Sequence, residues 1–585
     1  MNFSQIYVLI VVVLLVFALY KEIVNPGIVF FLSAVALVVG KIITPQELLS
    51  GLSNVQIIII FLLVTVTAGI RKLVGSKFFS RLFSHELRPL QFLLRMIMFV
   101  SVISAFLNNT PIVAFMIPYV REWAQRTGNP VSKFLIPLSF ATVLGGMITV
   151  IGTSTNLVLN GLIDDYKLPL LGFEDFFYLG VCVTILGWIY FYFVGYNLLP
   201  AYVAKFDTVK GNLKEYIVET EIFSGSKIIG KSVKEAGLRS LVDLFLVEIA
   251  RGERVISPVS PEELLERGDL LYFSGNTDAI YNFIKEQNGL GVHQNPLESG
   301  RFNFLEAVVP ANSTLVGVKI KNSNFRKKYD ASIVAIQRDG MRLGSKVGET
   351  VLQGGDFLLL VAGEDHQMTI GSSNLFIVSV PKSIEAAKPK WFKYVGLVSF
   401  LILLSGVLNY IPLFFACLLV LCVFVFLKIL GLEEIQQSLD LGLLTILVCS
   451  LAVGIALEKS GAAALLAGWL IQTGKYFGVV AALSSLFMFT LILTQLITNA
   501  AAVAIVFPVA MSMASQLNLP TTPFFVAIAF AASACFLSPI GYQTNLMVYG
   551  PGGYSFKDFF RVGLPLTVIY TATCILFITF FYNLN

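Results

Sequence analysis

The sequence predicts an α-helical, polytopic membrane protein that consists of two related halves with a soluble α+β insert between them. The first observation is composition: 56% of the residues are hydrophobic and 13% are charged, and the mean hydropathy is +0.80, far outside the globular range. The second is a pair of polar motifs that occurs in both halves. The third is a charged segment over residues 204–385 that separates the halves.

Hydropathy predicts membrane spans in the same order in both halves. They lie near residues 6–20, 27–40, 55–70, 134–163 and 176–199, and near 393–410, 412–427, 441–457, 520–550 and 562–582. Each half also contains a broken apolar stretch, at about 90–123 and 478–515, which we interpret as a re-entrant hairpin. The first span is expected to be a retained helix, because no Lys or Arg precedes it and no small-residue cleavage site follows.

Five crossings and one hairpin per half make the number of crossings odd, so the second half should insert upside down, as an inverted repeat. Basic residues mark cytoplasmic loops, and they follow the third span and the first hairpin: Arg71, Lys72, Lys77, Arg81, Arg88, Arg121, Arg126 and Lys133. The loop after the fourth span is acidic, with Asp164, Asp165, Glu174 and Asp175. Both termini are therefore expected outside and the insert inside. The alternative is two full crossings in each broken stretch.

The predicted organisation is a transmembrane repeat over residues 1–203, two soluble modules over 204–298 and 299–385, and a second transmembrane repeat over 386–585. The insert is duplicated at an offset of 87 residues, which pairs the Ile-x-Arg ending at Arg251 with the one ending at Arg338. A Leu-x-x-Gly-Asp motif recurs at the same offset, at Asp269 and Asp356. Alternating apolar residues around these motifs predict strands.

Each copy of the insert resembles the RCK-C module, the C-terminal domain of TrkA-type potassium-transport regulators. The resemblance implies a small α+β domain that senses a ligand and forms dimers. A homodimer and a cytoplasmic nucleotide ligand are therefore expected. The insert contains no Gly-x-Gly-x-x-Gly fingerprint, so a Rossmann partner domain is not predicted.

Two polar runs recur in the two membrane halves. The run Leu107–Ala114 returns about 390 residues later as Ile497–Ala504, and Gly152–Leu157 returns as Gly541–Leu546. Each run is uncharged, rich in Asn, Thr and Gly, and set in an apolar stretch, where polar groups are costly unless they have partners. Broken helices in duplicated halves indicate the binding site of a secondary transporter.

Asn109 and Asn499 are the leading candidate residues, because each lies at a hairpin tip, where half-helix ends leave backbone groups without intrahelical partners. A helix N-terminus favours an anion, and unwound carbonyl oxygens suit sodium. The alternative is that these polar residues only hold helices together, as they do in many membrane bundles.

The tips resemble the paired Ser-Asn-Thr motifs of the divalent anion/sodium symporters (DASS), and Thr149–Asn156 and Ser538–Asn545 resemble the helix-break loops of that family. The resemblance implies Na+ as the coupling ion. The implied sodium ligands are Ser104, Asn108, Asn109 and Gly152 at one site, and Thr494, Ile497 (backbone), Asn499 and Ser538 at the other. The implied anion-binding residues are Asn109, Thr110, Thr155, Asn499 and Thr544.

The tips depart from the family motif at two positions: Asn108 replaces the first Ser, and Ala500 replaces the second Thr. One anion-binding hydroxyl is therefore missing. A dicarboxylate needs polar partners at both ends, whereas a compact tetrahedral anion needs fewer. Members with RCK-C inserts also resemble the sulfate-transporting branch. Sulfate is the first expected substrate and a dicarboxylate the second.

Other functions fit less well. An RCK-gated channel would need a filter such as Thr-Val-Gly-Tyr-Gly, which does not occur. An enzyme is not expected, because the sequence has no Gly-x-Ser-x-Gly, no His-Glu-x-x-His and no paired intramembrane acids. The histidines His85, His293 and His366 lie outside the spans, which favours sodium over a proton relay. Arg95 is expected to reach the membrane interface instead of the substrate.

The six cysteines have no metal-ligand spacing and are interpreted as small core residues. The formal net charge of +5 is small for this length, so nucleic acid is not an expected partner. The expected location is the plasma (inner) membrane, with the lipid bilayer, a small anion and sodium ions as partners.

Overall fold

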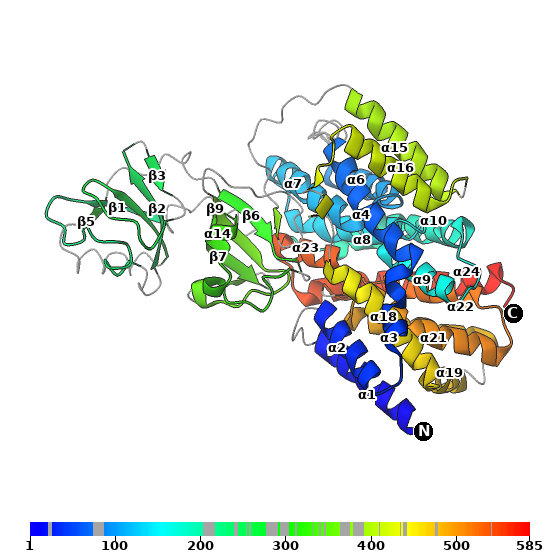
Figure 1. The fold of residues 1–585 in the computed structure, drawn as a ribbon. Coiled ribbons are helices and arrows are strands. Elements are labelled where there is room, and N and C mark those ends of the chain that lie inside the picture. The colour runs from blue at the N-terminus through cyan, green and yellow to red at the C-terminus, as the bar shows by residue number, and fades with distance from the viewer. Residues whose placement is uncertain are drawn as a thin grey trace. The chain divides into compact units, whose positions relative to one another are not determined.

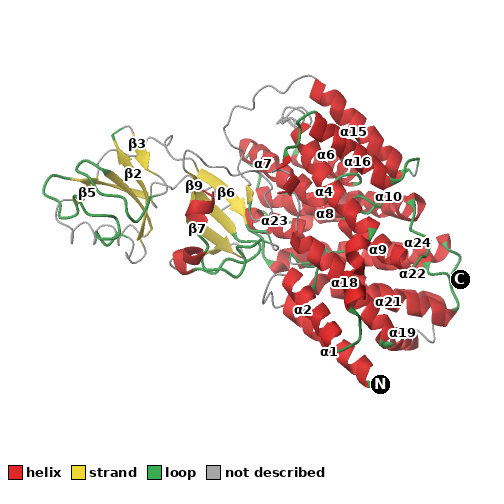
Figure 2. Ribbon diagram, in the orientation of Figure 1, coloured by secondary structure: helices red, strands yellow, loops and turns green. Residues whose placement is uncertain are grey.

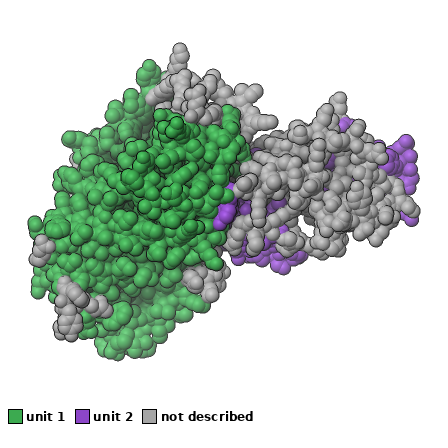
Figure 3. Space-filling model, turned by 180° about the vertical axis from the view of Figure 1, so that it is seen from behind, with its two compact units in different colours: residues 1–201, 383–549, 554–585 green, residues 202–382, 550–553 purple. Residues whose placement is uncertain are grey.

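The structure is a computed structural model of residues 1–585. It describes all residues except 21–25, 74–86, 203–216, 239–243, 253, 257–258, 276–289, 293–303, 311–312, 330, 339–340, 344–346, 363–374, 378–390, 409, 433–434, 437–440, 474–477, 540 and 585. The chain divides into two compact units (Figure 3), residues 1–201, 383–549 and 554–585, and residues 202–382 and 550–553. The domain boundaries predicted at 203/204, 298/299 and 385/386 lie outside the described residues, as do Lys77, Arg81 and the three histidines.

The first unit is helical (Figures 1 and 2). Its first half contains α1 (Phe3–Tyr20), α2 (Pro26–Val39), α3 (Pro45–Leu49), α4 (Val55–Leu73), α6 (Pro89–Ser104), α7 (Asn109–Thr127), α8 (Leu135–Gly146), α9 (Ser154–Asp165), α10 (Phe173–Tyr190) and α11 (Tyr196–Leu198). Its second half contains α15 (Trp391–Val407), α16 (Leu413–Phe426), α18 (Leu441–Lys459), α19 (Ala462–Thr473), α20 (Gly478–Leu496), α21 (Asn499–Leu517), α22 (Thr522–Ser533), α23 (Gln543–Gly552) and α24 (Phe556–Phe581).

The tips and breaks lie where the sequence predicts them. A short turn separates α6 from α7 and α20 from α21, while longer non-helical segments separate α8 from α9 and α22 from α23. The two helices that follow the tips also end alike, at a residue with left-handed backbone: Gly128 has φ +69° and Asn518 has φ +55°. This conformation lets the next amide groups satisfy the last carbonyl oxygens of a helix.

Five segments among the described residues are long and apolar enough to cross a membrane: Pro45–Ile70, Phe173–Leu198, Gly478–Leu496, Asn499–Leu517 and Phe556–Phe581. This supports the prediction of a polytopic membrane protein. Two of these segments are α20 and α21, the arms of the second broken stretch. Each arm has 19 residues, so by length two full crossings fit this stretch as well as the predicted re-entrant hairpin does.

Two local expectations were wrong. Helix α19 was not predicted; the Leu444–Lys459 and Ala462–Gln472 segments meet at an angle of 74°, because Gly461 takes a left-handed φ of +74° that ends α18. Arg121 and Arg126 were expected in a cytoplasmic loop, but both lie within α7, and Arg121 is 6% exposed. Hydropathy missed this because the helix continues past its apolar core to Thr127.

The two halves pack on each other reciprocally. Helix α2 packs against α18, and α16, the counterpart of α2 in the second half, packs against α4, the counterpart of α18. The second contact is close, because a Cβ added to Gly69 of α4 would lie 2.2 Å from the Phe424 ring of α16. Such paired contacts are expected when two equivalent halves face each other.

The second unit contains two five-stranded antiparallel sheets. The first consists of β1 (Ile217–Ile222), β2 (Leu244–Arg251), β3 (Arg254–Ile256), β4 (Leu270–Gly275) and β5 (Leu290–Val292) in the order β3-β2-β4-β1-β5. The second consists of β6 (Phe304–Val308), β7 (Ala331–Arg338), β8 (Met341–Arg342), β9 (Phe357–Ala362) and β10 (Phe376–Ile377) in the order β10-β6-β9-β7-β8. With strands matched in chain order, the two orders are the same.

The repeated motifs of the insert form an equivalent Arg–Asp ion pair in each sheet. Arg251 Nε donates to Asp269 Oδ1 at 2.8 Å, and Arg338 Nε donates to Asp356 Oδ1 at 2.7 Å. Both aspartates are fully buried, and each arginine makes a second bond to the same carboxylate, a strong bidentate arrangement. The Asp269 carboxylate raises the pKa of Arg251. Each Arg–Asp pair therefore stabilises the sheet to which it belongs.

Candidate functional site

The first tip brings a hydroxyl, an amide and two carbonyl oxygens together. Ser104 ends α6 and Asn109 begins α7, and neither is more than 1% exposed. Ser104 Oγ lies 2.5 Å from Asn109 Oδ1 and 2.9 Å from the carbonyl oxygen of Thr142. The Oδ1 position of Asn109 also lies 3.1 Å from the carbonyl oxygen of Thr142 and 3.2 Å from the carbonyl oxygen of Gly152 in the break loop. We call these four residues the first cluster.

The Asn109 amide fits this environment in two orientations. With its nitrogen facing the cluster, it donates to the carbonyl oxygens of Thr142 and Gly152. With its oxygen facing the cluster, that oxygen accepts from Ser104 Oγ and lies beside the carbonyl oxygens of Thr142 and Gly152. Three acceptor oxygens then converge, as they do around a bound cation. Transporters bind Na+ with such uncharged oxygens of unwound backbone. The first cluster can therefore exist as a hydrogen-bonded group or as a sodium site.

The second tip repeats this arrangement. Thr494 Oγ1 lies 3.0 Å from Asn499 Oδ1 and 2.6 Å from the carbonyl oxygen of Ala532. In both halves the hydroxyl precedes the asparagine by 5 residues and the carbonyl by 38. We call Thr494, Asn499, Ala532 and the break-loop residue Gly541 the second cluster. The thiol of Cys535 also lies here, 2.9 Å from Asn499 Oδ1.

A glycine of the break loop closes each cluster. A Cβ on Gly152 would lie 2.8 Å from the carbonyl oxygen of Ser104, and a Cβ on Gly541 would lie 2.8 Å from the carbonyl oxygen of Thr494. Only glycine allows the backbone to approach this closely. The glycines of the predicted break motifs are therefore required by the geometry of the clusters.

Three helix N-termini meet beside the first tip. Helix α7 begins at Asn109, α9 directly follows Thr153, and α23 begins at Gln543. Thr110 Oγ1 donates to Gln543 Oε1 at 3.1 Å, and the Tyr542 hydroxyl is hydrogen-bonded to Asn109. Helix N-termini present N–H groups and positive partial charge, which favours an anion without a charged side chain.

Several predicted site residues have other contacts. The Asn108 side-chain oxygen accepts from Thr110 N at 3.4 Å and so caps α7. Thr155 Oγ1 is 3.3 Å from the hydroxyl of Thr153, which caps α9. These side chains stabilise helix starts next to the first cluster, and the described contacts do not place them in it.

The remaining predicted residues belong to the second half. Thr544 Oγ1 lies 2.8 Å from Ser139 Oγ on α8, so it joins the two halves. The carbonyl oxygen of Ser538 accepts from Asn545 Nδ2 at 3.1 Å, which braces the break loop. Ile497 is 4% exposed in the turn between α20 and α21. Of the predicted residues, Ser104, Asn109 and Gly152 thus lie together, as do Thr494 and Asn499.

Three residues at the tips were missed. Tyr542 and Gln543 reach from the second break loop to the first tip, and Cys535 enters the second cluster. The sequence contained a signal for the first two, because they align with the smaller Thr153 and Ser154 of the first half. The contact of Cys535 follows no local pattern.

No charged side chain takes part in either cluster as the structure describes them. Arg95 is exposed on α6. Over the described ranges, no group of three or more His, Cys, Asp or Glu residues could hold a metal ion. A cation at the tips would therefore have uncharged oxygen ligands.

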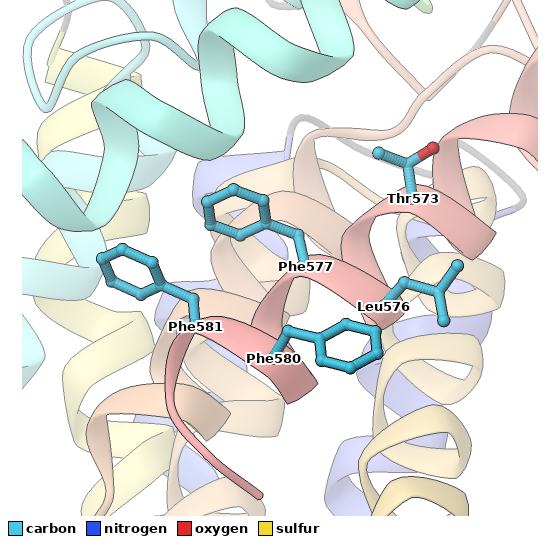
Figure 4. Close-up of a pocket in the computed structure, with 5 residues that line it drawn as sticks. All are labelled: Thr573, Leu576, Phe577, Phe580 and Phe581. Carbon is cyan, nitrogen blue, oxygen red and sulfur yellow. The ribbon is translucent and has the colours of Figure 1, made fainter.

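An apolar hollow on α24 is a poor candidate for an anion site. Figure 4 shows its lining, Thr573, Leu576, Phe577, Phe580 and Phe581, all on this one helix. The Thr573 hydroxyl donates to a carbonyl of its own helix, at Ile569, over 2.8 Å. Phe580 is 66% exposed. The hydroxyl of Thr573 is thus engaged within its own helix, and the rest of the lining is apolar.

Comparison with known proteins relates this chain to a family of transporters. A family model described as citrate transporter (CitMHS) matches residues 8–410 and 399–584. A Synechocystis protein named "Uncharacterized transporter" is 32% identical over 95% of this chain and 93% of its own length. A Chlamydomonas reinhardtii protein named "Putative sulfur deprivation response regulator" is 31% identical over 94% of this chain and 97% of its own length. Sodium/sulfate cotransporter 1 of the same alga is 24% identical over 90% of this chain and 84% of its own length.

Proposed function

This chain belongs to the citrate transporter family, and we propose that it is a sodium-coupled symporter of a small divalent anion, with sulfate as the first candidate. The observation that carries the proposal is the duplicated cluster of hydroxyl, asparagine amide and carbonyl oxygens at the two tips. Na+ binds among the tip oxygens, which are in place in the first cluster. The anion binds beside the first tip, at the helix N-termini.

Tyr542 and Gln543 favour a compact anion. They lie beside the first tip. The residues at the aligned positions of the first break loop, Thr153 and Ser154, are smaller. Ala500 supplies no hydroxyl at the second tip. A tetrahedral dianion can be held by helix N-termini and few side chains, whereas a dicarboxylate would need room and a second set of polar partners. The name of the sodium/sulfate cotransporter relative agrees with this choice.

A dicarboxylate or citrate is the second candidate. The observation that favours it is the matching family model, which is described as citrate transporter. The two candidates differ in size and in the number of carboxylate groups that need partners, so competition between substrates separates them.

The architecture that accompanies this proposal is a DASS-like inverted repeat in the inner (plasma) membrane, forming a homodimer. The insert is proposed to be cytoplasmic and regulatory, with two RCK-C-like modules that bind a nucleotide. Support comes from the matching strand orders of the two sheets and from the paired Arg–Asp contacts at the offset of 87 residues.

Uptake into proteoliposomes tests the transport proposal. With labelled sulfate outside and an inward Na+ gradient, sulfate should accumulate, and replacement of Na+ by choline should remove the accumulation. Excess unlabelled sulfate should compete better than succinate or citrate. Equal uptake in choline and Na+ would contradict sodium coupling, while stronger competition by citrate would select the second candidate.

The double variant Tyr542→Thr with Gln543→Ser is expected to relax substrate choice. It gives the second break loop the residues of the first and vacates space beside Asn109, so succinate should gain on sulfate by about tenfold in relative uptake. The matched control is Tyr178→Thr, since Tyr178 is 50% exposed on α10. An unchanged preference in the double variant would show that these residues do not set substrate size.

A further inference from the structure

The two clusters differ at one position. In the first half Gly146 ends α8, and a Cβ built there would lie 2.8 Å from Asn109 Oδ1 and 3.1 Å from the carbonyl oxygen of Gly152. In the second half this place is taken by Cys535, whose Sγ lies 2.9 Å from Asn499 Oδ1. Backbone without a side chain therefore packs against the first asparagine, whereas a cysteine side chain packs against the second.

The equivalence of Gly146 and Cys535 follows from the break loops. Each loop is braced by an asparagine amide that donates to a carbonyl oxygen seven residues earlier, at 3.1 Å in both loops. Aligning the loops on this contact places Cys535 opposite Gly146. The preceding residue, Gly145, is also glycine, so a shift of one residue still leaves the first half without a side chain there.

The thiol contacts the other oxygens of the second cluster as well. Cys535 Sγ lies 3.3 Å from Thr494 Oγ1, 3.6 Å from the carbonyl oxygen of Thr494 and 3.6 Å from that of Gly541. Cys535 is fully buried. The hydroxyl and the break-loop carbonyl are the counterparts of the Ser104 and Gly152 oxygens that face Asn109. The sulfur therefore occupies the centre of the second cluster.

A neutral thiol is a poor ligand for Na+, because a hard cation prefers oxygen and soft sulfur suits copper or zinc. A thiol can nevertheless donate a weak hydrogen bond. In the second cluster its S–H donates to the Asn499 oxygen, so this oxygen has a partner without a cation. The thiol thus takes the position among these oxygens where a cation would have to sit, and it is already the partner of the amide oxygen.

We infer that Cys535 closes the second cluster to Na+, so that sodium coupling takes place at the first cluster alone. This inference rests on the proposed sodium-coupled transport and goes beyond it, because a duplicated tip would otherwise provide two equivalent sodium sites. Cys535 is in this sense a residue that sets the coupling ratio.

The experiment measures the Na+ to anion ratio in proteoliposomes held at zero membrane potential with K+ and valinomycin. For the wild type and Cys535→Gly, the sulfate gradient that stops net flux is determined against a fixed Na+ gradient. The variant should move one more Na+ per anion. A tenfold Na+ gradient should then balance a sulfate gradient about tenfold steeper than in the wild type.

Cys535→Ala is a second variant, because it vacates the sulfur position without the chain freedom that glycine adds. Cys417→Ala is the matched control, since Cys417 is a fully buried thiol on α16. An unchanged ratio in both Cys535 variants, with sodium-dependent uptake intact, overturns the inference. So does loss of uptake in both while they remain folded by size-exclusion chromatography. A wild type without sodium dependence would instead overturn the proposed function.

Discussion

Asn109→Ala is expected to abolish sodium-dependent uptake. The variant removes the amide that faces Ser104 and the carbonyl oxygens of Thr142 and Gly152, and it leaves these buried groups without their central partner. Loss of one oxygen ligand should weaken Na+ binding by about 3 kcal/mol, or about a hundredfold. The half-saturating Na+ concentration and the maximal rate of sulfate uptake measure the effect.

Asn499→Ala should act differently, because the Asn499 oxygen already accepts from a hydroxyl and a thiol. We expect sulfate affinity to fall while the half-saturating Na+ concentration changes by less than about tenfold. Asn129→Ala, at the far end of α7, is the control, since its amide donates to Thr127 Oγ1 at 2.9 Å. Normal uptake with normal sodium dependence in Asn109→Ala would refute the site.

Gly152→Ala is expected to reduce transport by about a hundredfold, because a site held in a fixed geometry tolerates little displacement of its groups. The new Cβ would lie 2.5 Å from the carbonyl oxygen of Gly146 and 2.8 Å from that of Ser104. Both neighbours are backbone atoms and cannot rotate away, so the break loop must shift and carry the Gly152 carbonyl away from Asn109. Initial rates of uptake at saturating Na+ measure the loss.

Gly454→Ala on α18 is the control for this change, because its nearest neighbour would be the Ala504 carbonyl oxygen at 3.5 Å, an ordinary contact. Both proteins should be equally abundant in the membrane and elute alike from a sizing column. Near-normal transport by Gly152→Ala would mean that the break loop can move without affecting the site, and the role assigned to the Gly152 carbonyl would fail.

Much of the local structure follows from the sequence. The helix breaks at Gly152 and Gly541 and the tips at Asn109 and Asn499 are visible as polar runs in apolar surroundings, where a helix can stop only if its backbone groups find partners. The strands of the insert follow from alternating apolar residues. The inverted orientation of the halves, the re-entrant character of the hairpins and the RCK-C assignment stay predictions.

Contacts between segments that are distant in the sequence were harder to predict. The family resemblance implied Asn108 as a sodium ligand, whereas in the structure its side-chain oxygen accepts from Thr110 N and caps α7. The same residue type serves either role, and only the direction of the side chain separates them. Arg121 and α19 were misjudged because a hydropathy window averages over helix ends and cannot see what packs against them.

The sequence by itself determined that this protein has two membrane halves, broken helices, uncharged polar tips and a duplicated insert, because these depend on hydropathy and on turn chemistry within a few residues. Only the tertiary structure decided which oxygens meet. Tyr542 reaches Asn109 across 433 positions of the chain, and Cys535 enters the second cluster across 36. Such contacts depend on how helices pack, and packing is set by the whole fold and not by any local pattern.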